Sequence, residues 1–200
     1  MTHLVDLSYE PSGFFPIIIH SFLVKEYDSV KDDLIKNSYE LKKNDPEGKN
    51  ASNAGGWQSK SSKLTDENPL LNNIILSSIK NLPLVENLDI DIDGWTNINF
   101  PGSFNTSHNH PNCHLSGVFW IKVPDNSGDI IFEDPNNFNK FVELESYTED
   151  FKNYFGCSRI MHSPEEGQIL IFPSYLVHMV DNNNSCEDRI SYAFNIRINL

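Results

Sequence analysis

The spacing of apolar residues in this chain changes from a helical to a strand period near residue 86. Before that point, two stretches, 25–43 and 66–81, place apolar side chains at helical spacing among charged and polar ones. After it, apolar and polar residues alternate in short runs separated by turn residues. The strand candidates are 88–93, 95–100, 115–123, 129–133, 168–172 and 189–198, with the first two meeting at Asp93-Gly94. This order predicts a mainly β fold with flanking helices on one side of a double-sheet jelly roll.

The length fits one domain with a substantial core, and no internal repeat divides the 200 residues. We expect a single domain over 1–200, in which 1–85 forms a helical support and loop region. Residues 86–200 then form the β core. The polar stretch 44–64 is predicted to be a long loop, and Trp57 within it is expected to anchor the loop on the core or to cover a site.

Composition limits the partners. A net charge of -13 argues against nucleic-acid binding, which depends on Lys and Arg neutralising phosphates. Neither a signal peptide nor a membrane span is indicated at the start of the chain. The three cysteines, Cys113, Cys157 and Cys186, are widely spaced and form no CxxC pair, so reduced thiols and a cytoplasmic location are expected.

Three histidines predict a metal site. His108 and His110 are two residues apart, and residues i and i+2 of an extended strand project to the same side. His178 follows another strand candidate, 168–172, and strand ends of a barrel-like double sheet can meet at one mouth. Three imidazoles would leave open coordination positions, as in non-haem iron oxygenases. His114 and His162 are weaker candidates, expected at the surface or supporting the metal ligands from behind, and His3 and His20 are expected to have no functional role.

Arg189 and Ser191 predict a carboxylate-binding arm beside this metal. A guanidinium can donate two hydrogen bonds to one carboxylate, and Ser191 faces the same side of the strand. Arg189 lies in an otherwise apolar strand, which favours this role over a surface ion pair with Glu187 or Asp188. Asn97 and Asn99 share one strand face and are candidates for hydrogen bonds to the same ligand.

The order of these motifs resembles the 2-oxoglutarate and iron(II)-dependent oxygenases of the prolyl-hydroxylase-like superfamily, in a little-characterised bacterial and phage branch. The resemblance spans about 54–198 and is carried by His108 to Trp120, Ile131 to Pro135, Gly167 to His178 and Arg189 to Asn195, with Gly55 to Ser59 and Trp95-x-Asn97-x-Asn99 upstream. It implies a double-stranded β-helix core, with Fe(II) and 2-oxoglutarate as cofactors. It also implies dioxygen as a reactant, with hydroxylation of an unidentified small-molecule or peptide substrate.

One position departs from the superfamily pattern. The superfamily usually has His-x-Asp or His-x-Glu, whereas His110 occupies the carboxylate position here. Three neutral imidazoles compensate less of the metal charge than two imidazoles and a carboxylate. Asp134 or Glu133 is the alternative third ligand. Two other classes stay open: a cupin-type metalloprotein that does not use 2-oxoglutarate, in which Arg189 has no task, and a non-enzymatic jelly-roll binding or structural module.

The substrate is not identified by the sequence. Loops choose the substrate in such folds, and 44–64 and 136–165 are the candidate segments.

Overall fold

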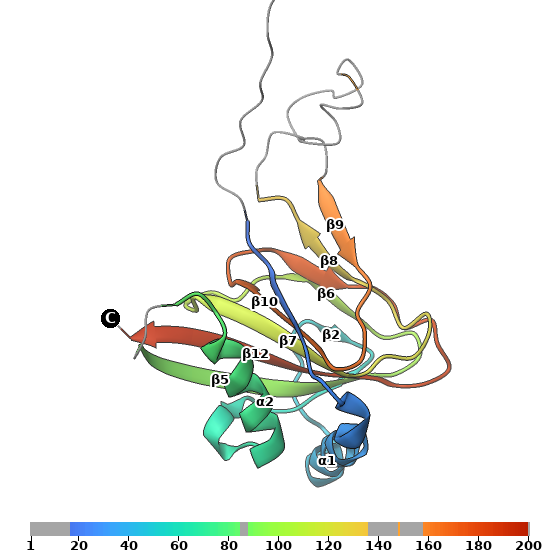
Figure 1. Cartoon of the computed structure of the whole chain (residues 1–200). Coiled ribbons are helices and arrows are strands. Elements are labelled where there is room, and N and C mark those ends of the chain that lie inside the picture. Colours follow the sequence, from blue (N-terminus) through green and yellow to red (C-terminus); the bar gives the residue numbers. More distant parts are fainter. Residues whose placement is uncertain (1–16, 85–87, 136–147, 149–157, 200) are drawn as a thin grey trace, which may run out of the picture.

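Two antiparallel sheets face one another in the computed structural model, which describes residues 17–84, 88–135, 148 and 158–199 (Figure 1). The larger sheet has the order β1-β10-β7-β12-β5-β3, with β4 also paired to β5. Its strands are β1 (His20–Leu23), β3 (Trp57–Gln58), β4 (Ser62–Lys63), β5 (Asp89–Asn99), β7 (Leu115–Lys122), β10 (Gln168–Pro173) and β12 (Arg189–Asn199). The smaller sheet has the order β2-β6-β11-β8-β9. Its strands are β2 (Asn53–Ala54), β6 (Phe104–His108), β8 (Ile130–Glu133), β9 (Arg159–His162) and β11 (His178–Val180). The predicted double-sheet jelly roll is confirmed.

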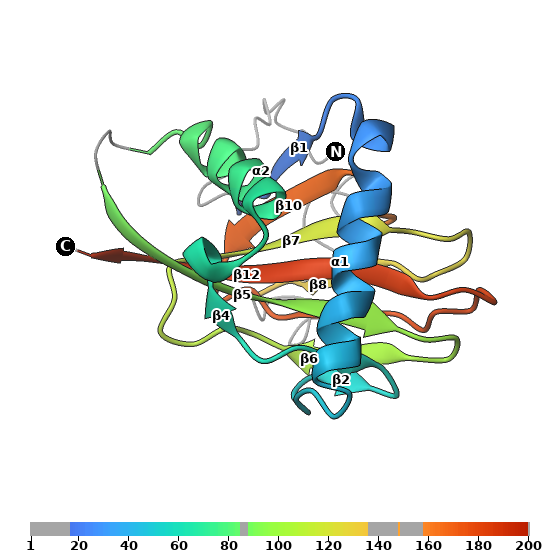
Figure 2. The same ribbon diagram turned by 90° about the horizontal axis from the view of Figure 1, so that it is seen from below.

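Two helices cover the outer face of the larger sheet, α1 (Lys31–Asn44) and α2 (Pro69–Lys80) (Figure 2). Short 3-10 turns lie at Tyr27–Ser29 and Leu64–Asp66. Pro69 occupies the first turn of α2, where its missing N–H costs nothing, and the Asn68 side chain accepts a hydrogen bond from Leu70 N at 2.8 Å. Apolar side chains of both helices join one buried cluster with the sheet. None of the helices in the described ranges is long and apolar enough to cross a membrane.

The turn expected at Asp93-Gly94 is wrong. Residues 89–99 form one continuous strand, β5, that pairs with β12 along its whole length. Gly94 lies opposite Phe194 inside this pairing, and a Cβ there would lie 2.3 Å from the Tyr192 hydroxyl oxygen. The glycine is therefore required by the close approach of a buried tyrosine rather than by a turn.

The stretch expected as a long loop, 44–64, holds the three two-residue strands β2, β3 and β4. Trp57 is buried in the main core, and its indole N–H donates to Asp45 O at 2.9 Å. Trp57 therefore anchors this segment on the core, one of its two expected roles. Of the other candidate loop, 136–147 and 149–157 lie outside the described residues, as do His3 and Cys157.

Candidate functional site

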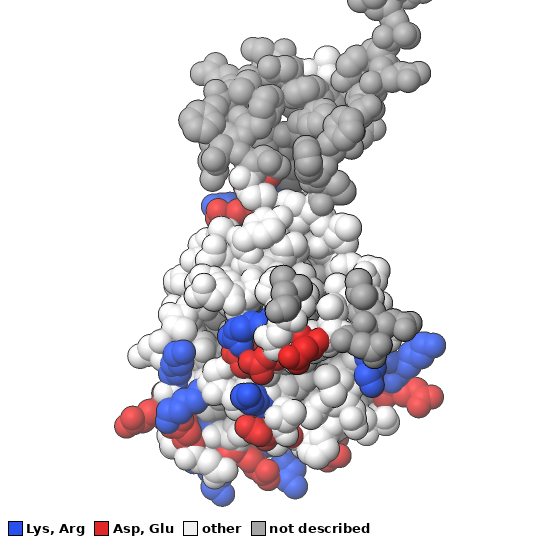
Figure 3. Space-filling model, turned by 90° about the vertical axis from the view of Figure 1, so that its left-hand side faces the viewer, with Lys and Arg blue, Asp and Glu red and all other residues white. Residues whose placement is uncertain are grey.

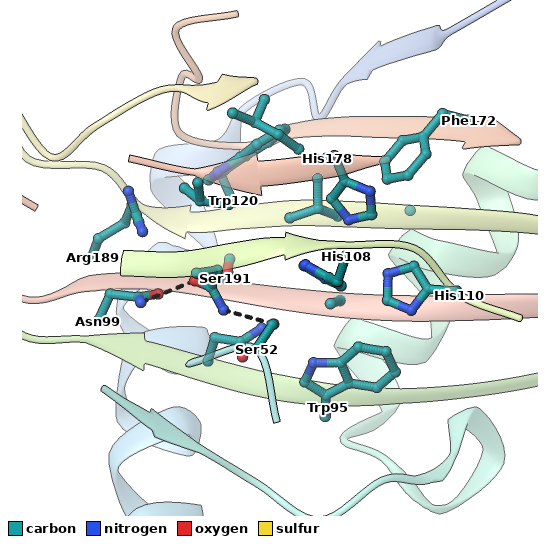
Figure 4. Close-up of a pocket in the computed structure, with 17 residues that line it drawn as sticks. Ser52, Trp95, Asn99, His108, His110, Trp120, Phe172, His178, Arg189 and Ser191 are labelled. Carbon is teal, nitrogen blue, oxygen red and sulfur yellow. Dashed lines mark hydrogen bonds between the residues drawn. The ribbon is translucent and has the colours of Figure 1, made fainter. Parts of the chain in front are cut away.

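The paired strands β12 and β5 form the floor of a pocket between the two sheets. Arg189 lies opposite Asn99, and Ser191 lies opposite Asn97. Alternate residues of a strand face the same side, so polar side chains of both strands point into the space between the sheets. The pocket is lined by these four residues and by Ser52, Trp95, Asn105, His108, His110, Gly117, Val118, Trp120, Ile130, Phe172, His178, Val180 and Ala193 (Figure 4).

The three predicted histidines meet at this pocket. His108 ends β6 and lies directly opposite His178, the first residue of β11, while His110 follows β6. The imidazole centroids of His108 and His178 are 4.4 Å apart, and those of His108 and His110 are 5.1 Å apart. One ring nitrogen from each histidine lies within 4.8 Å of the others. This juxtaposition could hold one metal ion.

In two of these histidines, a hydrogen bond determines which ring nitrogen is left to bind a metal. His108 Nδ1 is 2.7 Å from Thr106 O, and His178 Nδ1 is 2.9 Å from Leu176 O. A carbonyl oxygen can only accept, so each Nδ1 carries the proton and each Nε2 keeps its lone pair. Histidine ligands of metals commonly donate their second ring N–H to a backbone carbonyl in this way.

The histidines are held neutral. Burial lowers the pKa of all three. Neighbouring imidazoles add to this effect at His110 and His178, whose pKa values fall to about 4 and about 3. A neutral imidazole is the form that binds a metal, since protonation would block the lone pair. At neutral pH the cluster is therefore ready to coordinate a cation.

Arg189 lies at the other end of the pocket from His110 and Trp95 (Figure 4). Its side chain is 1% exposed, and Nη1 donates to the carbonyl oxygen of Ser127, with longer contacts of 3.4 Å to those of Gly128 and Asp181. Nη2 has no partner among the described residues. Burial lowers the pKa of Arg189 to about 10, so it remains a cation at neutral pH. The surface ion pair considered from the sequence does not form, because Glu187 pairs with Lys122 and Asp188 accepts from Tyr39.

Two asparagines predicted as ligand-binding groups differ in their hydrogen bonding. The Asn97 side-chain oxygen is buried without a partner in the described structure. Asn99 Nδ2 donates to Asn105 Oδ1 at 3.1 Å, and Asn105 Nδ2 donates to Ser52 Oγ at 3.2 Å. Asn97 is therefore free to serve a bound molecule, whereas Asn99 belongs to a fixed amide chain.

Asn105 and Ser52 were not recognised from the sequence. A register shift between β6 and β11 places Asn105 opposite Val180 and His108 opposite His178, so the two pocket residues of β6 are three positions apart. This spacing departs from the strand period of two because of the irregularity. The sequence period therefore does not identify Asn105, three residues before His108, as part of the site.

No carboxylate of the described residues joins the three histidines. Within the described chain, the three histidines are the one group with metal-ligating geometry. Glu133 pairs with Arg159 at 3.3 Å and follows Phe132, the residue opposite His178, so it lies on the other face of β8. His114 and His162 also lie elsewhere: His114 Nδ1 accepts from Ile198 N, and His162 Nε2 contacts Gln168.

The pocket suits iron(II) and 2-oxoglutarate by the chemistry of its side chains. Imidazole nitrogens bind iron well, and three of them converge here. Among the described residues that line the pocket, Arg189 is the one charged group apart from the titratable histidines. A buried guanidinium with an unpartnered nitrogen is costly unless an anion binds it. A dicarboxylate would supply that anion.

Solved structures with the same fold support this architecture. A prolyl-4-hydroxylase from Pseudomonas putida is 13% identical with a TM-score of 0.62, covering 91% of this chain and 93% of its own. A prolyl hydroxylase from Trichoplax adhaerens in complex with a hypoxia inducible factor peptide is 10% identical with a TM-score of 0.58, covering 90% and 83%. HygX from Streptomyces hygroscopicus, with nickel and 2-oxoglutarate bound, is 9% identical with a TM-score of 0.56, covering 90% and 82%. No curated protein matches the chain in sequence.

The match to a family model goes further than the fold. A model described as "Putative 2OG-Fe(II) oxygenase" matches residues 93–195, just over half of the chain. The matched region contains all three histidines, Arg189 and Ser191. The chain therefore belongs to the iron(II)- and 2-oxoglutarate-dependent oxygenases.

Proposed function

We propose that this oxygenase is a hydroxylase in which His108, His110 and His178 bind the iron and Arg189 binds the distal carboxylate of 2-oxoglutarate. The observation that carries this assignment is the unpartnered Nη2 of Arg189 in the same pocket as the three imidazoles. Ser191, two residues along β12, adds a hydroxyl on the same face. Asn97, opposite Ser191, adds an amide whose oxygen has no partner among the described residues.

The overall reaction in this proposal consumes dioxygen, 2-oxoglutarate and a substrate C–H bond. It yields succinate, carbon dioxide and a substrate C–OH, so one oxygen atom enters each organic product. The bound iron(II) supplies the site at which dioxygen is reduced. Arg189 and Ser191 orient the cosubstrate, because a fork of donors fixes a planar carboxylate in direction as well as position. The apolar side chains of Trp120, Ile130 and Phe172 exclude water from this part of the pocket.

The partners in this proposal are dioxygen and a small-molecule or peptide substrate. On the face shown in Figure 3, basic and acidic side chains are interspersed. Arg197 pairs with Asp91 and Asp93. With a net charge of -13, this distribution disfavours nucleic acid as the substrate. The free thiols of Cys113 and Cys186 suit a reducing compartment such as the cytoplasm.

The proposal treats the chain as one domain over 1–200. Residues 1–85 would supply the helical support and the short strands β2 and β3, and 86–200 would supply the catalytic core. In the cupin alternative, which does not use 2-oxoglutarate, the buried charge of Arg189 would have no anion to bind. The match to the family model also favours the oxygenase.

Isotope labelling tests the reaction type. The iron-loaded protein is incubated with ¹⁸O₂, 2-oxoglutarate and a small-molecule extract, and the products are analysed by mass spectrometry. We expect one labelled oxygen in succinate and one in a new alcohol, with both lost in His178→Ala. His20→Ala, which changes a histidine of β1 outside the pocket, is the matched control and should behave as wild type. A substrate-derived product without label would refute hydroxylation, and labelled succinate from His178→Ala would refute the ligand assignment.

A further inference from the structure

A second, wider cavity adjoins the histidines on the side away from Arg189. Its volume is about 450 Å³, and it shares Ser52, Trp95, His108 and His110 with the cosubstrate pocket. It extends to Asp93 and Asn195, which lie opposite each other on β5 and β12. Arg189 lies six residues before Asn195 on β12, so the histidines separate an anion-binding end from this wider end.

Two buried amides face this cavity without using their full hydrogen-bonding capacity. Gln58 is 5% exposed and lines the cavity, and its side-chain amide has no hydrogen-bond partner among the described residues. Asn195 is 7% exposed; its Oδ1 accepts from Ser116 Oγ at 2.9 Å, whereas its NH₂ group has no partner among the described residues. Both amide groups line the open cavity and are not enclosed by protein, so they are accessible to a bound molecule. Amides at these positions suit a ligand that both donates and accepts hydrogen bonds.

The strands hold these groups in place before any ligand binds. Gln58 lies opposite Asn97 in the β3–β5 pairing, so its side chain shares the face of β5 that carries the pocket residues. Asn195 is fixed between its partners on β5 and β7. Groups on paired strands lose little freedom on binding, which favours a specific recognition site over incidental polarity.

The charges near the cavity favour an uncharged ligand. Asp93 is already ion-paired with Arg197 and accepts a hydrogen bond from Ser61 Oγ at 2.9 Å, so it is not a free partner for an amine. Lys49 is exposed. The remaining polar lining is made of amides and hydroxyls, with the ring of Trp95 beside His110 at a centroid distance of 5.6 Å. Several neutral hydrogen-bonding groups spread around a wide cavity suit several hydroxyls better than one apolar ring.

We propose that this cavity, bounded by Gln58, Trp95 and Asn195, is the primary-substrate site and binds a neutral polyhydroxylated small molecule of sugar or cyclitol type. The inference rests on the proposed function, because it places a substrate C–H bond beside the histidine cluster. Gln58 and Asn195 then act as specificity-determining residues, each hydrogen-bonding substrate hydroxyls through an amide.

Paramagnetic NMR with defined probes tests the site. Protein loaded with Mn(II) and 2-oxoglutarate is mixed with myo-inositol, sucrose or N-acetylprolinamide, and broadening of the probe protons is compared with that in zinc-loaded protein. We expect broadening of myo-inositol or sucrose but not of N-acetylprolinamide. Gln58→Leu and Asn195→Leu should each weaken the probe affinity about 5- to 10-fold, the usual effect of one lost hydrogen bond. Asn73→Leu, on the exposed side of α2, is the matched control.

The outcomes separate this inference from the proposed function. Broadening of N-acetylprolinamide that survives Gln58→Leu would overturn the inference, as would the absence of broadening for both polyols while 2-oxoglutarate still binds. Failure of the metal-loaded protein to bind 2-oxoglutarate would instead refute the proposed function, whereas polyol broadening sensitive to Gln58 would still support the cavity. Thermal midpoints of the variants, measured without ligand, show whether a lost signal reflects unfolding.

Discussion

Replacing Arg189 should weaken 2-oxoglutarate binding by an amount that the structure allows to be calculated. Nη1 is shared among backbone carbonyls, so Nη2 is the nitrogen free to bind a ligand carboxylate. One charge-assisted hydrogen bond contributes about 1.5–3 kcal/mol. Because a tenfold change in affinity corresponds to about 1.4 kcal/mol, Arg189→Met should raise the Kd for 2-oxoglutarate roughly 10- to 100-fold. Arg189→Lys keeps the charge but loses the planar guanidinium that is anchored through Nη1, so its Kd should fall between those of the wild type and Arg189→Met.

Isothermal titration calorimetry on protein loaded with redox-inert Mn(II) measures this effect. 2-Oxopentanoate serves as a second ligand, because it has the same chain length as 2-oxoglutarate without the distal carboxylate. Arg189→Met should lose the discrimination between the two ligands that the wild type shows. Arg159→Met removes an exposed arginine of β9 and is the matched control. A coupling free energy near zero between the Arg189 substitution and the distal carboxylate, in a folded variant, would refute the reasoning.

Three further predictions concern the metal ligands and the sheet. His110→Ala should lower metal affinity more than about 10-fold, whereas His110→Asp should retain one metal per chain because a carboxylate restores a ligand. Metal analysis after dialysis distinguishes the two variants. Full metal retention in His110→Ala would contradict the assignment of His110 as a ligand. The metal-free protein should lose stability as pH falls below about 6.5, the ordinary histidine pKa, because the pKa values of about 4 for His110 and about 3 for His178 mean that the unfolded chain binds more protons in this window. Each histidine changes the free energy of unfolding by at most ~1.4 kcal/mol per pH unit. Urea unfolding between pH 7.5 and 5 should therefore show a smaller loss of this free energy in His178→Asn than in the wild type. Equal losses in the two proteins would contradict the prediction. Gly94→Ala should reduce the free energy of unfolding by about 1–3 kcal/mol, because its Cβ would meet the Tyr192 hydroxyl oxygen, and an unchanged denaturation midpoint would show that the tyrosine moves freely.

The sequence predicts the parts of this protein that repeat a local pattern. The long strand carrying Arg189 and Ser191 and the two helices are visible in the hydrophobic period, since each buries one face against a core. The turn predicted at Asp93-Gly94 is wrong because the sequence does not distinguish a glycine in a turn from a glycine packed against a tyrosine ring. The partner that distinguishes them, Tyr192, is distant along the chain.

The candidate site is predictable only where its residues form motifs. His108, His110 and His178 are recognisable by spacing and by their places after strands, and the structure brings them together. Asn105 carries no such signal, and Gln58 lies in the Gly55 to Ser59 motif without a role that the sequence assigns to it. Gln58 reaches the cavity through a two-residue strand, and Asn105 reaches the pocket through a register shift. Both depend on long-range pairing that local periodicity does not encode.

Anaerobic titration of the iron(II)-loaded protein with 2-oxoglutarate tests the central claim most directly. If the three histidines hold iron and leave room for the cosubstrate, a weak visible metal-to-ligand charge-transfer band should grow and saturate at one equivalent per chain. The band should be absent in His178→Ala, and in Arg189→Ala it should require a much higher concentration of 2-oxoglutarate. A protein that retains its iron yet develops no band would contradict the account.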